Sequence, residues 1–195
     1  MVALRELGNI RRGHISTTRS SNLADPSSVR ALQMGDLPQD GSIPWAPLRR
    51  VQPAGSWKTS VIQDGDVVLP LRSTRVSAVV ARGVLPRTVA VGHWAIITAG
   101  PTVLPEYLAW YLAHPTMARQ WRQAEVGSKL AFVPLAAVRE MQVEVPPLDV
   151  QQRIVTVHAL HKRLTGLEQQ LQDARNEYVH AVTEAALDRA IHLSN

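Results

Sequence analysis

Residues 146–190 read PPLDVQQRIVTVHALHKRLTGLEQQLQDARNEYVHAVTEAALDRA, and this stretch decides the fold. After the proline pair no further proline occurs in it, and apolar residues return at alternating spacings of three and four. This heptad pattern predicts one long helix with a narrow apolar stripe along one side. The stripe consists of Val157, Leu160, Leu164, Leu167, Leu171, Ala174, Tyr178, Ala181 and Ala185.

The predicted helix is too long for one small domain to cover its stripe. At about 1.5 Å per residue, a helix over residues 149–190 measures about 60 Å. We therefore expect the stripe to pair with a helix of another chain or of a second copy, and pairing with a second copy would give a homodimer. A helix that folds back onto its own domain is the alternative, and the length of the stripe argues against it. At its start, Asp149 is expected as the N-cap, with Gln152 completing a capping box.

The sequence predicts a globular domain of mixed α+β class over residues 1–148 and a separate helical region over residues 149–195. Short apolar runs bounded by glycine and proline indicate strands, whereas apolar residues at helical spacing indicate helices. We expect an opening strand up to Ile10, an exposed loop over 17–28 and a turn at Asp64-Gly65-Asp66. Further strands are expected at 67–69, 76–80, 94–98 and 141–145, and helices at 106–125, with Pro105 at the first helical position, and at 134–140.

The positive charge lies entirely ahead of the long helix. The formal net charge is +5; residues 1–150 contain 16 Lys and Arg against 11 Asp and Glu, while residues 151–195 contain 5 of each. Fourteen of those sixteen cations are arginines, whose forked donors suit phosphates and guanine edges. There is no cysteine, which fits a reducing compartment. With no apolar run of roughly 20 residues and no signal-peptide core, we expect a soluble, cytoplasmic protein.

Several patterns that could carry chemistry lack the residues that the chemistry needs. Gly127-Ser128-Lys129 has neither the upstream glycine nor the following Ser/Thr of a phosphate-binding loop. His158 and His161 lie one helical turn apart without a third metal ligand. Val145–Leu148 lacks the polar and aromatic residues of an amino-methyltransferase loop. We therefore expect no enzymatic activity, no metal and no cofactor in this chain.

Read in order, several segments resemble the specificity subunit of type I restriction–modification systems. The most specific is VEVPPLDVQQRIV at residues 143–155, which is similar to the proline-rich junction before that family's spacer helix. The other similar segments are LRELGNIRRG (4–13), GSIPWAPLRRV (41–51), DGDVVLPLRST (64–74), LPEYLAWYLAHPTMARQW (104–121) and GSKLAFVP (127–134). Members of this family usually carry two recognition domains and two spacer helices, whereas this chain has one of each and resembles a half-length form.

The resemblance implies a target-recognition domain that reads double-stranded DNA and a spacer helix that pairs two such domains. It also implies partners: a DNA methyltransferase subunit that holds S-adenosylmethionine, and in some systems a translocating endonuclease subunit. Two paired domains would read a bipartite site. The alternative is a coiled-coil DNA-binding regulator or interaction protein with no link to methylation, for which the Pro-Pro-Leu-x-x-Gln junction has no obvious use.

If the first domain binds DNA, cationic and hydroxyl side chains in loops beside strands are the candidates. They are Arg49, Arg50, Lys58, Arg72, Ser73, Thr74, Arg75, Arg82, Arg87, Ser128 and Lys129. Lesser candidates are Arg11, Arg12, Arg19 and Arg30. Trp45 and Trp57 lie between basic residues and could pack on a sugar or base, although core burial is more usual for tryptophan. Trp94, Trp110 and Trp121 are assigned to the core.

Overall fold

The computed structural model describes residues 1–15, 18–20, 28–37, 43–72, 77–127 and 132–193, without the side chains of 18–20, 185–186 and 188–193. The contacts between residues divide the chain into two units, Met1–Arg153 and Ile154–Asn195. The first contains the sheets and short helices, and the second is purely helical. None of the described helices has an apolar run sufficient to span a bilayer.

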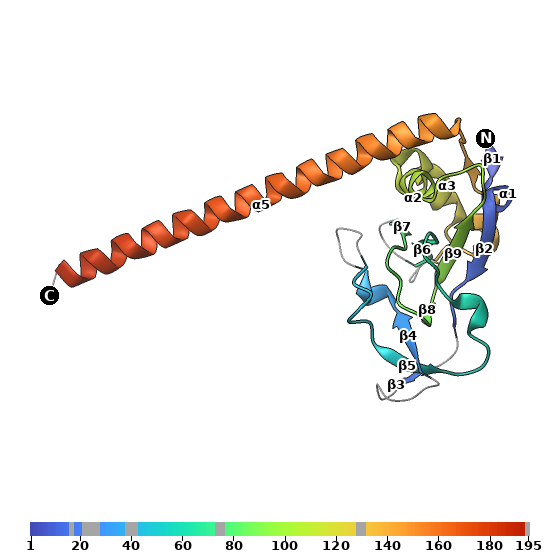
Figure 1. Ribbon diagram of the computed structural model, residues 1–195, viewed down its shortest axis with the longest axis horizontal. Helices are drawn as coiled ribbons and strands as arrows, with labels where there is room; N and C mark the ends of the chain where they lie inside the picture. Colours follow the sequence, from blue (N-terminus) through green and yellow to red (C-terminus); the bar gives the residue numbers. More distant parts are fainter. Residues whose placement is uncertain (16–17, 21–27, 38–42, 73–76, 128–131, 194–195) are drawn as a thin grey trace. The chain divides into compact units, whose positions relative to one another are not determined.

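The first sheet is antiparallel and has the strand order β2-β9-β6-β7 (Figure 1). Its strands are β2 (Gly8–Arg12), β6 (Val67–Pro70), β7 (Val79–Val80) and β9 (Trp94–Ala99). The predictions of β6 and β9 are confirmed, because runs of Val and Ile suit a strand buried on both faces. The strand predicted over 76–80 is shorter than expected and forms only β7.

The second sheet has the order β3-β5-β4-β8 and mixes one parallel pair with two antiparallel pairs. Its strands are β3 (Thr18–Ser20), β4 (Val29–Leu32), β5 (Arg50–Pro53) and β8 (Thr88–Ala90). The parallel pair joins β4 to β8. The prediction of an exposed loop over 17–28 is wrong at β3, because pairing with β5 overrides the local preference of its polar residues.

A buried cluster with residues from both sheets forms the centre of the first unit. Trp94 and Ile96 of β9 and Val68 of β6 contribute from the first sheet, and Leu32 and Ala90 from the second. These five side chains are fully buried. The remaining buried members come from the connecting segments: Ile43, Leu48, Ile62 and Ala81. Two distant parts of the chain are therefore held in one core.

The N-terminal segment is not the single strand that its apolar pattern predicts. β1 (Val2–Ala3) pairs with β10 (Gln142–Val143), and the helical turn α1 (Leu4–Leu7) separates it from β2. Leu4 and Leu7 both lie in the core, which the turn allows because residues three apart share a helical face. Gly8 then starts β2, where a Cβ atom would stand 2.2 Å from the carbonyl oxygen of Thr98. Only glycine permits this approach to β9.

The helix predicted over 106–125 is two helices. α2 (Pro105–Ala113) and α3 (Ala118–Ala124) are separated by a 3-10 turn at Pro115–Met117. Pro115 has no N–H to donate to the carbonyl of Tyr111, so the helix ends and the N–H of His114 takes that acceptor at 3.0 Å. Pro105 occupies the first turn of α2 as predicted.

α4 (Leu135–Glu140) confirms the short helix expected near residues 134–140, and β10 is a shorter version of the strand expected after it. Trp94 and Trp121 are buried as predicted. The assignment of Trp110 to the core is wrong, since it is only partly buried and its ring packs against that of His114, with centroids 4.8 Å apart.

Turns join the strands at two further points. The predicted turn at Asp64-Gly65-Asp66 is confirmed, with Gly65 at φ +87° and the carboxylate of Asp64 accepting the N–H of Val84 at 2.7 Å. Two 3-10 turns occupy Met34–Asp36 and Lys58–Ser60.

The predicted long helix is confirmed as α5 (Leu148–Leu193), of 46 residues (Figure 1). It begins before Asp149, which lies inside the first turn and pairs with Arg153 at 3.4 Å, so the prediction of Asp149 as N-cap is wrong. Gln151 in the same turn is fully buried. The side chains of the stripe are exposed from Val157, at 66%, through Leu171, at 52%, to Tyr178, at 71%.

Candidate nucleic-acid interface

Four chain segments lie next to one another at one end of the first sheet. Arg12, the last residue of β2, is opposite Ala95 in β9. Just before β9, the carbonyl of His93 accepts the N–H of Leu71 at 2.8 Å, and the carbonyl of Leu71 accepts the N–H of Val133 at 2.8 Å. Backbone hydrogen bonds therefore set the order of these segments across the sheet end.

The side chains at this sheet end form a cationic site with one aromatic ring. We call Arg12, Arg72, His93 and Phe132 the basic corner. Both arginines are exposed and His93 is partly buried. The rings of His93 and Phe132 have centroids 6.0 Å apart. Burial lowers the pKa of the His93 imidazole, and the charges of Arg72 and Arg12 lower it further.

Arg11, next to the corner, points to the opposite face of the sheet and has a structural role. Its guanidinium lies 2.6 Å from the carboxylate of Asp66 and donates to the carbonyl of Val61 at 2.7 Å. Asp66 is 1% exposed and also accepts from Thr98 at 2.5 Å. These contacts hold Arg11 inside the unit, so its assignment as a lesser DNA-binding candidate is not supported by its position.

A second group of basic residues lies on the second sheet, and we call Arg30, Arg49, Arg50, Lys58 and Arg87 the second basic cluster. Arg30 and Arg50 are directly opposite in β4 and β5. The N–H of Arg30 donates to the carbonyl of Arg87 at 3.0 Å, and the side chain of Arg50 donates to Ser28 at 2.9 Å. Three predicted candidates, Arg49, Arg50 and Arg87, thus lie beside the lesser candidate Arg30, and Lys58 directly follows Trp57, whose ring contacts Arg87.

Arg87 has an unusual backbone conformation, and its guanidinium contacts an aromatic ring. Its φ of +60° is in the left-handed region, which non-glycine residues rarely adopt. Its guanidinium lies over the ring of Trp57, 5.5 Å from the centroid, as in a cation–π contact. Lys58 follows Trp57 directly and is exposed. Trp57 therefore supports a cation, whereas Trp45 packs at the edge of the central core.

Arg82 belongs to neither group. It forms an ion pair with Glu106 of α2, which offsets its charge. Ser73, Thr74, Arg75, Ser128 and Lys129, and the side chain of Arg19, lie outside the described residues. The described residues that flank 73–76 and 128–131 include Arg72 and Phe132 of the basic corner.

Sequence reasoning did not identify His93 or Phe132. A lone histidine after a glycine and a lone phenylalanine carry no local signal, and only strand pairing places them beside Arg72. Among the described side chains, no group of three or more His, Asp or Glu could hold a metal ion. Burial, then Lys162 and His161, lowers the pKa of His158.

No protein-family model matches the chain, and no curated protein matches it by sequence. Solved structures do match it in fold. The HsdS subunit from Thermoanaerobacter tengcongensis superimposes with a TM-score of 0.61 at 20% identity, over 86% of this chain and 38% of that chain. The S subunit of a type I restriction–modification system from M. genitalium gives a TM-score of 0.53 at 9% identity, over 86% of this chain and 40% of that one.

A third match comes from a structure that describes complex assembly and conformational transition of the type I R-M system. Its TM-score is 0.58 at 19% identity, over 90% of this chain and 41% of that chain. The chain thus spans about two fifths of the length of the structures it matches. Over most of its own length it has the mixed α+β fold of type I restriction–modification specificity subunits, as its sequence predicts.

Proposed function

We propose that this chain recognises duplex DNA as the specificity subunit of a type I restriction–modification complex or a related methylation-based defence complex. The observation that carries the proposal is the shared fold with S subunits over 86% of the chain. The position of the charge supports it, because the whole cationic excess lies in residues 1–150. The basic corner and the second basic cluster would supply phosphate contacts, and neighbouring loops would read bases.

The chain would contribute recognition and no chemistry of its own. A methyltransferase subunit that holds S-adenosylmethionine would be its partner, and a translocating endonuclease subunit could join the same complex. The proline-rich junction before α5 supports this reading over a free-standing regulator, since it resembles the junction of specificity subunits.

The stripe on α5 would pair two recognition units. Large apolar side chains such as Leu160, Leu164 and Leu171 are more than half exposed, and burying each against a partner helix would contribute about 1.5–3 kcal/mol. At about 1.5 Å per residue, the 46 residues of α5 extend about 70 Å. A symmetric pair would hold two recognition units apart and read an inverted repeat with a fixed gap.

Selection of binding sites from a random duplex library by the purified chain tests this function. We expect enrichment of one inverted repeat with a constant gap, and affinity that falls steeply with added salt. The double variant Leu164→Asp/Leu171→Asp should enrich only a half-site. Failure to enrich any sequence would overturn the proposal.

Genome-wide mapping of methylated adenines, after co-expression with a cognate methyltransferase subunit, separates the two function classes. A specificity subunit directs methylation to the selected sequence. A regulator unconnected with methylation binds its site and leaves the methylation pattern unchanged, and this result would favour the alternative.

A further inference from the structure

Several arginines of the first unit pair with a carboxylate, whereas those of the basic corner have no such partner among the described residues. Arg5 pairs with Glu140, Arg11 with Asp66 and Arg82 with Glu106. Within the described part of the chain, neither Arg12 nor Arg72 forms an ion pair. Two cations therefore lie near a histidine, and no carboxylate of the described residues pairs with either of them.

The position of these groups is set by the sheet and not by flexible surface side chains alone. The N–H of Gly13 donates to the carbonyl of Trp94 at 2.9 Å, and that of Leu71 donates to His93 at 2.8 Å. Arg12 is opposite Ala95, two residues after His93, and Leu71, the residue before Arg72, is hydrogen-bonded to His93, so the backbones of the two arginines flank that of His93. Because β9 lies between β2 and β6, two interstrand spacings of about 4.8 Å separate the backbones of Arg12 and Arg72, a gap of about 10 Å that two long arginine side chains can bridge to contact one anion.

We propose that Arg12, Arg72 and His93 together bind one phosphate of duplex DNA, with the ring of Phe132 as the apolar wall of the site. This inference rests on the proposed function and names a residue, His93, that the sequence did not single out. Two guanidinium forks suit the oxygens of a phosphate diester, and a protonated imidazole donates a third charge-assisted hydrogen bond.

Proton uptake is the consequence that distinguishes this site from any other cationic surface. In the free protein burial, then the charges of Arg72 and Arg12, lower the pKa of His93 from its ordinary value, which favours the neutral imidazole. A bound phosphate offsets the two positive charges and favours the imidazolium, which raises the pKa of His93. Affinity for duplex DNA is therefore greatest at pH values below the pKa of His93 in the free protein. It declines as the pH rises through the higher pKa of His93 in the complex.

The groups that face His93 come from three segments. Arg12 is on β2, Arg72 follows β6, and Phe132 is uncharged. His14, beyond Arg12, is a nearby titratable group; it is buried, its Nε2 has no partner among the described residues, and its carbonyl accepts the N–H of Gly92 at 2.8 Å. An assay must therefore report on His93 itself.

The first test measures the salt dependence of binding to the duplex selected above. Arg12→Ala and Arg72→Ala should each lower the slope of log Kd against log salt by about one unit. Arg5→Ala is the matched control, because it removes the same charge from an exposed arginine near the opposite end of β2. Unchanged slopes in a wild-type background that binds DNA would overturn the phosphate site and leave the proposed function standing.

The second test follows the His93 imidazole by NMR, with His93→Gln used to assign its signal. Addition of the duplex should raise its pKa by about one unit, equivalent to about tenfold tighter binding at about pH 5 than at about pH 8. His93→Gln should remove this pH dependence, whereas His161→Gln on α5 should retain it. A His93 pKa unmoved by bound duplex would overturn the inference; a wild-type chain that binds no duplex would instead overturn the proposed function.

Discussion

The side-chain oxygen of Gln151 accepts the backbone N–H of Leu104 at 2.8 Å, which joins the first turn of α5 to the start of α2. The amide nitrogen of Gln151 donates to the carbonyls of Thr102, at 3.0 Å, and Pro146, at 2.8 Å. One fully buried carboxamide therefore satisfies three backbone groups from two distant segments. This explains the glutamine in the Pro-Pro-Leu-x-x-Gln junction: it anchors the beginning of the long helix.

Replacement of Gln151 by alanine should destabilise the first unit. The change removes the partner of three part-buried backbone groups, and we expect a loss of about 2–4 kcal/mol. Urea unfolding followed by tryptophan fluorescence measures it. Gln123→Ala, at an exposed position of α3, is the matched control and should change the free energy of unfolding by less than about 0.5 kcal/mol. Equal effects of the two substitutions would contradict the role of Gln151.

The buried pair of Asp66 and Arg11 predicts a second effect on stability. Asp66→Ala removes the carboxylate that pairs with the Arg11 guanidinium, which is 19% exposed, and should cost about 3–5 kcal/mol. Asp36→Ala is the matched control. Each carboxylate accepts the backbone N–H of the residue three positions earlier, Asp66 from Gln63 at 2.9 Å and Asp36 from Gln33 at 2.7 Å. Asp36→Ala should cost about 1 kcal/mol. Comparable losses from both, by thermal or urea unfolding, would show that the ion pair contributes little.

The stripe of α5 predicts a dimer, and negatively charged side chains placed in the stripe should dissociate it. Leu164→Asp with Leu171→Asp places carboxylates in the expected seam and should raise the dimer Kd more than about 100-fold. Thr165→Asp with Gln172→Asp adds the same charges one residue away from the stripe and should leave the dimer intact. Light scattering over a dilution series measures both. A wild-type chain that remains monomeric throughout would contradict the pairing.

The order of large and small residues in the stripe predicts antiparallel helices. Its first half carries Val157, Leu160 and Leu164, and its second half Ala174 and Ala181. Antiparallel pairing sets large against small residues and keeps the seam uniformly filled, whereas parallel pairing sets alanine against alanine.

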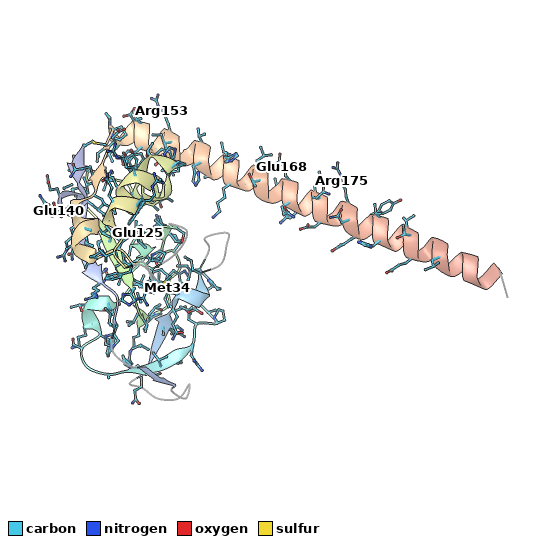
Figure 2. The ribbon with its side chains drawn as sticks, turned by 180° about the vertical axis from the view of Figure 1, so that it is seen from behind. Met34, Glu125, Glu140, Arg153, Glu168 and Arg175 are labelled. Carbon is cyan, nitrogen blue, oxygen red and sulfur yellow. The ribbon has the colours of Figure 1, made fainter. Side chains whose placement is uncertain are left out.

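A charge pair favours the same orientation. Glu168 and Arg175 flank the stripe one heptad apart (Figure 2). In an antiparallel pair, Glu168 of one helix can therefore lie beside Arg175 of the other, and Arg175 beside Glu168.

Single cysteines in this cysteine-free chain test the orientation. In an antiparallel pair Leu171→Cys, near the symmetry axis, should form a disulfide-linked dimer on oxidation, whereas Leu160→Cys should not. Non-reducing gels detect the product. Efficient cross-linking at both positions would indicate parallel helices.

Local patterns in the sequence determined the elements whose residues specify them without distant partners. The heptad repeat determined α5, the Val and Ile runs determined β6 and β9, and Pro105 marked the start of α2. Helix periodicity and strand alternation are readable in this way because they depend on neighbours a few residues away. The mixed α+β class followed from these elements.

Only the tertiary structure decided which residues meet. The sheet formed by β3, β5, β4 and β8 depends on pairing between segments far apart in sequence, so its strands carry weak local signals. In the first sheet, β2 separates two adjacent arginines: Arg11 turns inward to Asp66, while Arg12 is exposed on the other face. Strand alternation and register, which the sequence does not reveal at this position, make the first structural and leave the second available for a ligand.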